Sequence, residues 1–322
     1  MGEPRTRRTR LGWSRAVIVF LSALGLGAVS IPTARAQTYL YNRADFAAGG
    51  SPAAVVASDF NSDRILDLAV ANRADNTIWV LLGKPDGSFA PQVVYPTGNS
   101  PVALVAADFN GDGKEDLAVA NLNSFSLSIF LGNGDGTFQA AANIPASSNP
   151  QFVAVADLNG DGKLDLVTAN NGSDNMSVLL GNGDGTFKPR TDYPAMLGAT
   201  AIVIGDFNGD GLPDVATANL FDSTFSVLIG RGDGTFSSPA RFWAGSSTIP
   251  NSITAADFDG DGSLDIAVSS QEGNLSVLRN EPTIALSTSI LNFGPQPVQT
   301  ASSPLTITLT NPGTTRLSIS GI

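Results

Sequence analysis

The feature that most constrains this chain is an internal repeat of 49 residues. An aspartate-rich loop begins at Asp59 with the sequence DFNSDRILD, and related loops follow at intervals of 49, 49, 49 and 51 residues. A glycine-rich segment ending in phenylalanine keeps the 49-residue interval. Such repeats are structural units that bury a core only by stacking on their neighbours. The later loops begin at Asp108, Asp157, Asp206 and Asp257, and the glycine-rich segments end at Phe89, Phe138, Phe187 and Phe236.

Each repeat reads as four short strands. In the second repeat, Pro101–Ala107, Asp116–Ala120 and Ser126–Leu131 are β-rich runs bounded by turn residues. The following Asn-Gly-Asp-Gly predicts a hairpin, because these residues accept the positive φ of such turns. Phe138 is then expected to begin a fourth strand. No 3.6-residue period runs for a helix's length, so the sequence predicts an all-β, five-bladed β-propeller of four-stranded blades.

The ends of the repeat array predict how the propeller closes. Leu40 lies 19 residues before Asp59, the same spacing that separates Phe89, Phe138 and Phe187 from their next loops. Residues 39–46 are therefore expected to be an outer strand whose blade lies at the other end of the chain. Pairing with residues 274–278 would complete the fifth blade and cover its edge. An open arc, or part of a larger ring, is the alternative. The propeller is assigned to residues 37–280.

The aspartate-rich loops are candidate calcium sites. Acidic or amide side chains stand at loop positions 1, 3, 5 and 9, usually with glycine at position 6. Alternating oxygen ligands on a tight loop suit a hard cation with six to eight oxygens, and clustered carboxylates would otherwise repel one another. The alternative is that Asp-Gly pairs only mark surface turns. The predicted ligands are Asp59, Asn61, Asp63, Asp67, Asp108, Asn110, Asp112, Asp116, Asp157, Asn159, Asp161, Asp165, Asp206, Asn208, Asp210, Asp214, Asp257, Asp259, Asp261 and Asp265.

The loops are not EF-hands, and they are not equal. An EF-hand needs glutamate at position 12 and flanking helices, whereas this chain has valine or threonine there and strands on each side. In the first loop Ser62 and Arg64 replace glycines, so position 6 must turn without glycine's freedom and beside an added positive charge. The fifth loop has Asp259 in place of asparagine, and we expect it to bind calcium most tightly.

Composition excludes several classes of chemistry. The chain has no cysteine and no histidine. Disulfides, thiol nucleophiles, imidazole bases and the usual zinc ligands are therefore absent. Without residues 1–36 the chain has 12 basic and 28 acidic residues, a formal charge of −16. This charge disfavours nucleic acid and anionic membranes, and most of it belongs to the loop aspartates.

The N-terminus resembles an export signal. A cluster of arginines precedes the apolar run of residues 16–29, and Ala34-Arg35-Ala36 resembles a cleavage site. The apolar run is too short to cross a membrane as a helix. We expect cleavage after Ala36 and a secreted, periplasmic or cell-surface location, by the general route or, given Thr6-Arg7-Arg8, the twin-arginine route.

With these motifs in hand, the chain resembles the FG-GAP/VCBS repeat family, relatives of the integrin α-subunit propeller. The D-F-N-G-D-G-x-x-D loop and the G-N-G-D-G-T-F hairpin carry the resemblance. It implies a β-propeller with calcium bound in the aspartate-rich loops. It also implies a secreted or cell-surface protein used in adhesion, ligand binding or scaffolding.

The tail after Glu281-Pro282 differs in composition. Residues 281–322 resemble the start of a Hydin-type (ASH, or choice-of-anchor) immunoglobulin-like module, through the L-N-F-G and L-T-N-P-G segments. The tail is less than half of the roughly 100 residues that such a sandwich needs. We therefore expect an incomplete module and a truncated chain.

The sequence predicts a binding or scaffold module rather than an enzyme. Its carboxylate pairs recur in every repeat, whereas an active site should break the symmetry. The expected partner is an extracellular protein or glycan, bound by a monomeric propeller. Arg231-Gly232-Asp233 spells an integrin-recognition tripeptide, but the other hairpins identify it as a variant turn. Trp79 is expected to pack between blades, and Trp243 is the better candidate for a ligand contact. A lectin-like module, or the non-catalytic part of a polysaccharide-active enzyme, is the alternative function.

Overall fold

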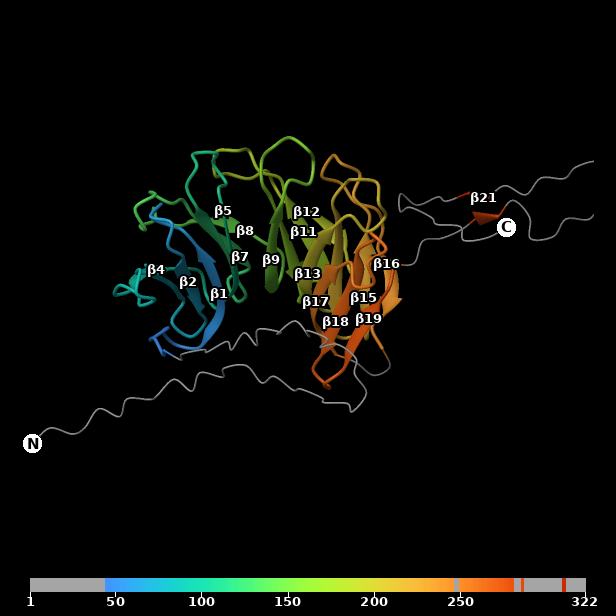
Figure 1. The fold of residues 1–322 in the computed structure, drawn as a ribbon, viewed down its shortest axis with the longest axis horizontal. Helices are drawn as coiled ribbons and strands as arrows, with labels where there is room; N and C mark the ends of the chain where they lie inside the picture. The colour runs from blue at the N-terminus through green and yellow to red at the C-terminus, as the bar shows by residue number, and fades with distance from the viewer. Residues whose placement is uncertain (1–43, 246–248, 281–284, 287–308, 311–322) are drawn as a thin grey trace, which may run out of the picture. The chain divides into compact units, whose positions relative to one another are not determined.

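The computed structural model describes residues 44–245, 249–280, 285–286 and 309–310 (Figure 1). The chain divides into two compact units, Met1–Ala47 and Ala48–Ile322. The predicted signal peptide lies outside the described residues, as does most of the predicted immunoglobulin-like module. Within that module only two short strands are described, and they pair antiparallel: β20 (Ala285–Leu286) and β21 (Leu309–Thr310). No helix of the described residues is long and apolar enough to cross a membrane.

The repeats fold into successive antiparallel sheets. The first sheet contains β1 (Pro52–Ser58), β2 (Asp67–Asn72), β3 (Thr77–Leu81) and β4 (Val93–Pro96). The second contains β5 (Pro101–Ala107), β6 (Asp116–Asn121), β7 (Ser126–Phe130) and β8 (Ala142–Pro145). The third contains β9 (Pro150–Ala156), β10 (Asp165–Asn170), β11 (Asn175–Leu179) and β12 (Thr191–Pro194). The fourth contains β13 (Ala199–Gly205), β14 (Asp214–Asn219), β15 (Thr224–Leu228) and β16 (Ala240–Trp243). The fifth contains β17 (Pro250–Ala256), β18 (Asp265–Ser270) and β19 (Leu275–Leu278).

The strands of each sheet lie in chain order, and the predicted boundaries agree with them except at the hairpin. Phe138 was expected to begin the fourth strand, but it forms an isolated bridge with Gly132, and β8 begins four residues later. The physical reason is that its ring is buried against the preceding repeat, 5.4 Å from the Phe60 ring and 5.7 Å from the Tyr95 ring. The phenylalanine therefore anchors the hairpin to a neighbour.

Each sheet packs on the next through the same two rows of side chains. The innermost strands β1, β5, β9, β13 and β17 contact one another in succession. Each core cluster contains two residues from the third strand of one sheet, here called the middle strand. It also contains the fourth residue of the first, or inner, strand of the next sheet. In the first cluster these are Ile78, Val80 and Leu104. The later clusters join Leu127 and Ile129 to Val153, Met176 and Val178 to Ile202, and Phe225 and Val227 to Ile253.

The same two rows are exposed at the ends of the array. The middle-strand residues of the first four sheets are at most 8% exposed, whereas Leu275 and Val277 of the fifth sheet are 69% and 49% exposed. The inner-strand residue is at most 8% exposed in sheets two to five, whereas Val55 of the first sheet is 61% exposed. The last sheet therefore exposes one half of the repeating interface and the first sheet exposes the other.

The predicted closing strand is only partly described. Residues 39–43 lie outside the described residues, and residues 44–46 form no strand. The fifth sheet accordingly has three strands in the described part of the chain, with β19 at its edge. The pairing of residues 39–46 with residues 274–278, and a closed ring of five blades, stay predictions.

Candidate metal centre

The ninth residue of every loop is a buried aspartate that ties the loop together. Asp116 begins β6 and is fully buried. Its Oδ2 accepts the Phe109 N–H at 2.9 Å and its Oδ1 accepts the Gly132 N–H at 2.7 Å. Gly132 is required because a Cβ there would lie 2.3 Å from the Glu115 carbonyl oxygen. The corresponding residues Asp67, Asp165, Asp214 and Asp265 accept two backbone N–H groups in the same way.

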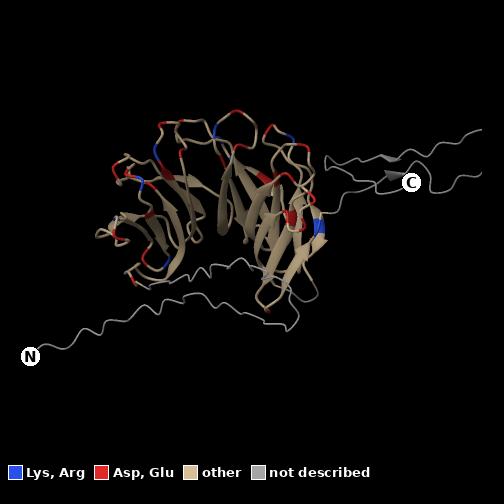
Figure 2. Ribbon diagram, viewed as in Figure 1, with Lys and Arg blue, Asp and Glu red and all other residues tan. Residues whose placement is uncertain are grey.

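The other predicted ligands hold the loop backbone in its tight coil. The Asp108 carboxylate accepts the N–H groups of Gly111, Asp112 and Gly113. Asn110 Oδ1 accepts the Asp112 N–H at 2.9 Å. Because these bonds fix the coil, the oxygens of positions 1, 3 and 5 share one short loop. Figure 2 shows that Asp and Glu gather in the loops at the strand ends and are sparse on the strands.

The loop coil requires left-handed backbone at positions 4 and 6. Gly111 and Gly113 have φ values of 73° and 78°. The first loop adopts the same turn without glycine, since Ser62 and Arg64 have φ values of 60° and 69°. Its Asp63 and Asp59 still accept loop N–H groups, so the sequence departure leaves the coil in place at the cost of strain.

Burial shifts the pKa of the ninth-position aspartates in the first four loops. Desolvation raises the pKa of the Asp67, Asp116, Asp165 and Asp214 carboxyls, and the two backbone N–H bonds offset part of this rise. The loop carboxylates at positions 1 and 5 raise these pKa values further by repulsion. A cation in the loop would act in the opposite direction, because it favours the ionised form.

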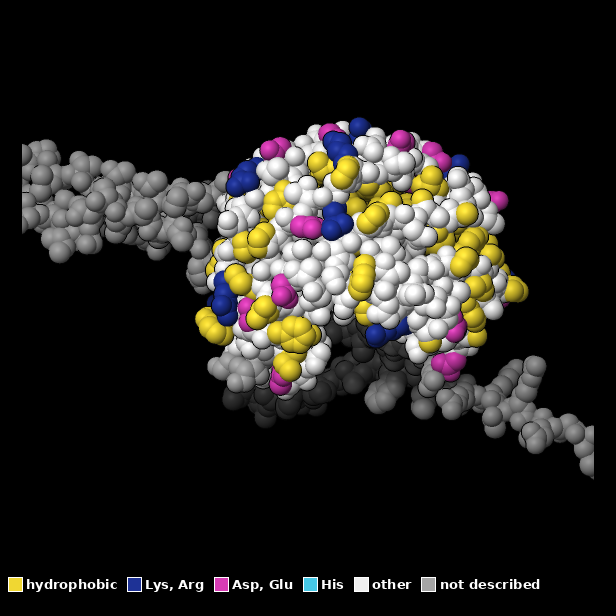
Figure 3. Space-filling model, turned by 180° about the vertical axis from the view of Figure 1, so that it is seen from behind, with side chains coloured by type: hydrophobic (Ala, Val, Ile, Leu, Met, Phe, Trp, Pro, Cys, Tyr) yellow, Lys and Arg dark blue, Asp and Glu magenta, His cyan; other side chains and the backbone are white. Residues whose placement is uncertain are grey.

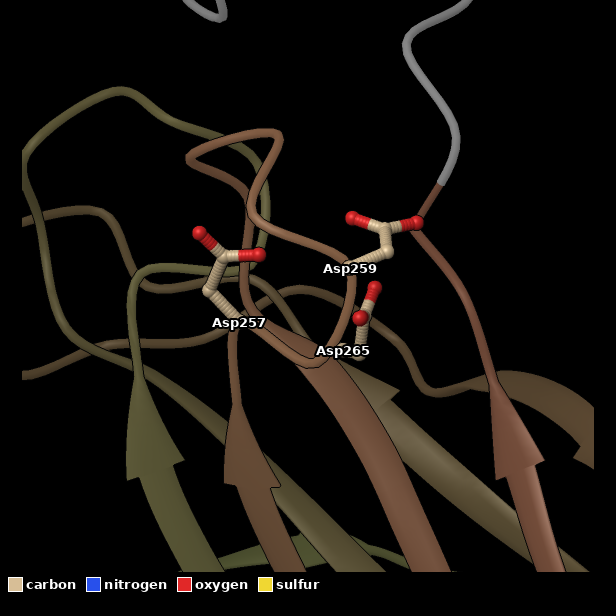
Figure 4. Close-up of side chains that lie close together, drawn as sticks. All are labelled: Asp257, Asp259 and Asp265. Carbon is tan, nitrogen blue, oxygen red and sulfur yellow. The ribbon is translucent and has the colours of Figure 1, made fainter. Parts of the chain in front are cut away.

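The fifth loop brings three carboxylates together. Oxygens of Asp257, Asp259 and Asp265 lie within 4.8 Å of one another, and Figure 4 shows all three at the turn that leads into β18. Two oxygens that bind one Ca²⁺ at about 2.4 Å can be separated by up to about 4.8 Å, so this donor set fits the ion. Asp261 is not part of the cluster; its Oδ1 accepts the Ser263 N–H. Arg279 lies 3.9 Å from Asp259, which offsets part of the added charge.

A carboxylate that accepts backbone N–H groups can still bind a cation. Each carboxylate oxygen has two lone pairs, and each oxygen of the ninth-position aspartates accepts one N–H group. Asn110 Oδ1 at position 3 and each Asp112 oxygen at position 5 likewise accept one N–H group. At position 1, Asp108 Oδ2 accepts one N–H group, whereas its Oδ1 already accepts three. The loops therefore offer the oxygen-rich donor set that Ca²⁺ prefers.

The first, second and fourth loops also contact the following repeat. The Gly136 N–H donates to the Phe60 carbonyl at 3.0 Å, and the Gly185 N–H donates to the Phe109 carbonyl at 3.1 Å. In the fifth repeat, Asn280 Nδ2 donates to the Phe207 carbonyl at 2.6 Å. The residue after the first aspartate thus carries an N–H bond to its own loop and a carbonyl bond to its neighbour.

The Arg-Gly-Asp tripeptide forms an ordinary hairpin. Asp233 accepts the N–H and hydroxyl of Thr235, as Asp135 does from Thr137. Arg231 Nη1 donates to the Phe236 carbonyl of its own hairpin at 2.8 Å. These contacts agree with the interpretation of the tripeptide as a turn.

The structure separates the two tryptophans. Trp79 is half buried on the face of the first sheet that points away from the second, in register with Val70 and Val94. Trp243 ends β16 and is 68% exposed. Arg241 lies over its ring, 5.1 Å from the centroid.

Sequence reasoning missed a row of buried asparagines that end the second strand of the first four sheets. Asn121 Nδ2 donates to Ser128 at 2.8 Å, and Asn170 donates to Ser177 at the same distance. The recurring Ala-Asn and the serine seven residues later are the signal for this pair. In the first sheet Trp79 replaces the serine, so Asn72 lacks that hydroxyl partner.

The repeated antiparallel sheets define an all-β repeat fold consistent with a β-propeller. The family model for the FG-GAP-like repeat matches residues 59–119, 108–168, 157–217 and 206–268, and the chain belongs to this family. The immunoglobulin-like resemblance of residues 281–322 has no such support. Comparison with curated proteins finds no match.

Several solved structures are similar to this chain. A protein of unknown function from Desulfotomaculum acetoxidans DSM 771 has a TM-score of 0.52 at 12% identity, covering 71% of this chain and 69% of that one. An Agrocybe aegerita lectin that recognises non-reducing terminal N-acetylglucosamine has a TM-score of 0.48 at 22% identity, with coverages of 72% and 67%. The V. cholerae biofilm matrix protein Bap1 has a TM-score of 0.45 at 20% identity, with coverages of 72% and 38%. These similarities bear on the fold alone.

Proposed function

We propose that the chain is an exported binding module, a five-bladed β-propeller whose loops each hold one Ca²⁺. The observation that carries the calcium proposal is the repeated loop geometry. Each loop carries a buried aspartate and three further oxygen-bearing side chains on one coil, as the second loop illustrates. In the fifth loop three of the carboxylates lie within 4.8 Å of one another. Hard oxygen ligands on such a coil are the donors that Ca²⁺ prefers.

Calcium would contribute a large share of the stability. Extracellular-type sites bind at about 10⁻⁴ to 10⁻³ M, so 1 mM Ca²⁺ adds about 0.4–1.4 kcal/mol for each occupied loop. Five loops give about 2–7 kcal/mol, against a typical net stability of about 5–15 kcal/mol. Without cysteine the chain has no disulfides to contribute instead.

Thermal unfolding with and without a chelator tests the calcium proposal. We expect the melting midpoint to fall when EDTA is added and to recover with excess Ca²⁺. Mg²⁺ at the same concentration serves as the control, because it demands octahedral geometry and dehydrates reluctantly. A midpoint that EDTA leaves unchanged would refute the proposal.

Two further parts of the proposal, export and a binding role, rest on the N-terminal segment and on the loops respectively. The predicted signal at residues 1–36 would deliver the chain to a compartment where millimolar calcium keeps the loops occupied. The mass of the protein recovered after expression tests cleavage after Ala36. We assign a binding rather than a catalytic role, because the carboxylate clusters recur from loop to loop.

The propeller would close by packing the fifth sheet on the first. Leu275 and Val277 expose the row that the other sheets bury, and Val55 exposes its counterpart. The segment 39–46 would then add the missing outer strand along β19. This arrangement buries both exposed rows and leaves no open edge.

Introduced cysteine pairs test the closure, because the chain has no cysteine of its own that could react with the cross-linker. Val55→Cys with Val277→Cys would be linked by a short bismaleimide, with Leu104→Cys and Val80→Cys as the equivalent pair of an existing interface. A link within one chain supports the closed ring. Links only between chains would instead indicate head-to-tail assembly, and no link would exclude the contact.

A further inference from the structure

The fourth repeat breaks the symmetry at one end of its sheet. At the end opposite the aspartate loop, three positions that are small or polar elsewhere carry large apolar side chains, namely Leu197, Phe221 and Trp243. Trp243 stands where the first three sheets end their outer strand with Pro96, Pro145 and Pro194. Phe221 stands where they have Ala74, Asn123 and Gly172, and Leu197 where they have Gly50, Asn99 and Ser148.

The three side chains are exposed rather than packed into the core. Trp243 is 68% exposed, Phe221 is 65% exposed and Leu197 is 53% exposed. Burying each such side chain would stabilise the protein by about 1.5–3 kcal/mol, and this fold does not bury them. Single exposed apolar side chains are ordinary on a protein surface, but a group of them marks a binding surface.

A backbone hydrogen bond, an ion pair and a cation–π contact connect the residues into one surface, which we call the aromatic patch: Leu197, Phe221, Asp222, Arg241 and Trp243. The Phe221 N–H donates to the Leu197 carbonyl at 3.1 Å, so the two side chains leave adjacent backbone segments. Arg241 Nη2 lies 3.7 Å from Asp222 Oδ2. The same guanidinium lies over the Trp243 ring, so the ion pair links Trp243 to Asp222, the residue that follows Phe221.

A hydrogen bond from Thr224 positions the Asp222–Arg241 ion pair. Asp222 accepts the Thr224 hydroxyl, and its side chain is only 12% exposed. Arg241 keeps 43% of its side chain exposed, so its remaining N–H groups can reach a ligand. The pair carries no net charge, and it offers both a carboxylate acceptor and guanidinium donors between two apolar surfaces.

We propose that the aromatic patch binds a neutral, pyranose-containing glycan. A pyranose combines an apolar C–H face with hydroxyl groups that both donate and accept hydrogen bonds. The aromatic rings of the patch can stack on the C–H face, and the Asp222–Arg241 pair can hydrogen-bond the hydroxyl groups. Small-ligand sites commonly combine an aromatic lining with a few placed polar groups in this way. This proposal rests on the binding role proposed above and names its ligand class.

Size and charge favour a glycan over a protein or an anionic polymer. A stable protein interface needs about 20–30 residues on each side, whereas this patch has five. The chain has a formal charge of −11, which disfavours anionic polymers. The space-filling view from behind shows hydrophobic side chains as separate small groups among polar ones, with charges of both signs nearby (Figure 3).

Tryptophan fluorescence and calorimetry test the proposal. Trp79→Phe leaves Trp243 as the reporter in residues 37–322, since the third tryptophan, Trp13, lies in the predicted signal. The probes are hexasaccharides of β-1,4-glucose, β-1,4-N-acetylglucosamine, α-mannose and β-1,4-xylose, titrated in 1 mM Ca²⁺. We expect at least one probe to shift the Trp243 emission and to bind the unaltered chain by calorimetry.

Substitutions then place the site. Trp243→Ala and Phe221→Ala should each weaken the binding at least tenfold, while the melting midpoint stays within 2–3 °C because both side chains are exposed. Phe125→Ala, an exposed aromatic in the turn between β6 and β7, is the matched control and should leave binding unchanged.

The outcomes separate this proposal from the calcium proposal. If no hexasaccharide binds, or if binding survives both patch substitutions, the glycan proposal is wrong, whatever EDTA does to the melting midpoint. Binding of a purified protein that Trp243→Ala abolishes, with no glycan binding, would assign the patch to a protein partner and overturn the glycan class.

Discussion

Substitution of the ninth-position aspartate should destabilise the fold even without calcium. Asp116→Ala removes the acceptor of two buried backbone N–H groups, those of Phe109 and Gly132. An unsatisfied buried donor costs about 1–3 kcal/mol, so the two together cost about 2–6 kcal/mol. Relief of the buried charge offsets part of this cost, because burial raises the pKa of the Asp116 carboxyl. We therefore expect the free energy of unfolding in EDTA to fall by about 2–4 kcal/mol.

Asp112→Ala is the matched comparison, because Asp112 stands in the same loop but is exposed. In EDTA it should cost less than about 1 kcal/mol, as exposed substitutions usually do. In 1 mM Ca²⁺ it should also lose the 0.4–1.4 kcal/mol that one occupied loop contributes, since it removes a predicted ligand. Urea unfolding of both variants, with Ca²⁺ and with EDTA, measures the four values. If Asp116→Ala unfolds like the unaltered chain in EDTA, the structural role assigned to the ninth aspartate is wrong.

Three further predictions concern the loops and hairpins. Arg64→Gly should raise the free energy of unfolding by about 0.5–1 kcal/mol, because Arg64 occupies left-handed backbone. Gly113→Ala should lower it by about 1 kcal/mol for the same reason. Urea unfolding in which the two substitutions do not have opposite effects would contradict the strain argument. Terbium luminescence should show that Asp257→Ala, in the carboxylate cluster of the fifth loop, loses a tighter site than Asp59→Ala at the same position of the first loop. Equal losses would count against the charge argument. The Thr137 hydroxyl and N–H hold the pKa of the Asp135 carboxyl below its usual value, so Thr137→Val should raise this pKa in a carboxyl NMR titration. A pKa that is lowered in the folded state stabilises the fold above about pH 4, and this stabilisation is lost as the pH falls. The valine variant should therefore be less stable than the unaltered chain at neutral pH and approach its stability in acid. An Asp135 pKa that does not change would exclude the hydroxyl as the cause of the shift.

The repeat made most of the fold predictable, because the strand runs and turn residues recur at a fixed interval. Pro101–Ala107 is β5 as predicted, and the positive φ at Arg64 follows from its place in the repeat. The two hydrogen bonds of Asp116 could not be predicted in the same way. They join residues seven and sixteen positions away, and only the hairpin's approach to the loop brings Gly132 within reach.

The aromatic patch was partly visible in the sequence. Trp243 was a candidate ligand contact because it departs from the repeat. Phe221 and Leu197 depart from it as well, but polar and small residues vary freely at those loop positions, so the departures alone carried little weight. Their meaning depends on exposure and on the Asp222–Arg241 pair, which require the fold.

The hydrogen bonds from each hairpin to the preceding loop have a consequence for how the chain responds to calcium. The Gly136 N–H donates to the Phe60 carbonyl, and the Gly185 N–H donates to the Phe109 carbonyl. An ion that ordered one of these loops would therefore also order the carbonyl to which the next hairpin is hydrogen-bonded. In the calcium-bound protein proposed above, neighbouring sites would therefore be thermodynamically linked, and we expect positive cooperativity of calcium binding between them. Loss of the proposed ion from one loop would therefore loosen the adjoining repeat before more distant ones.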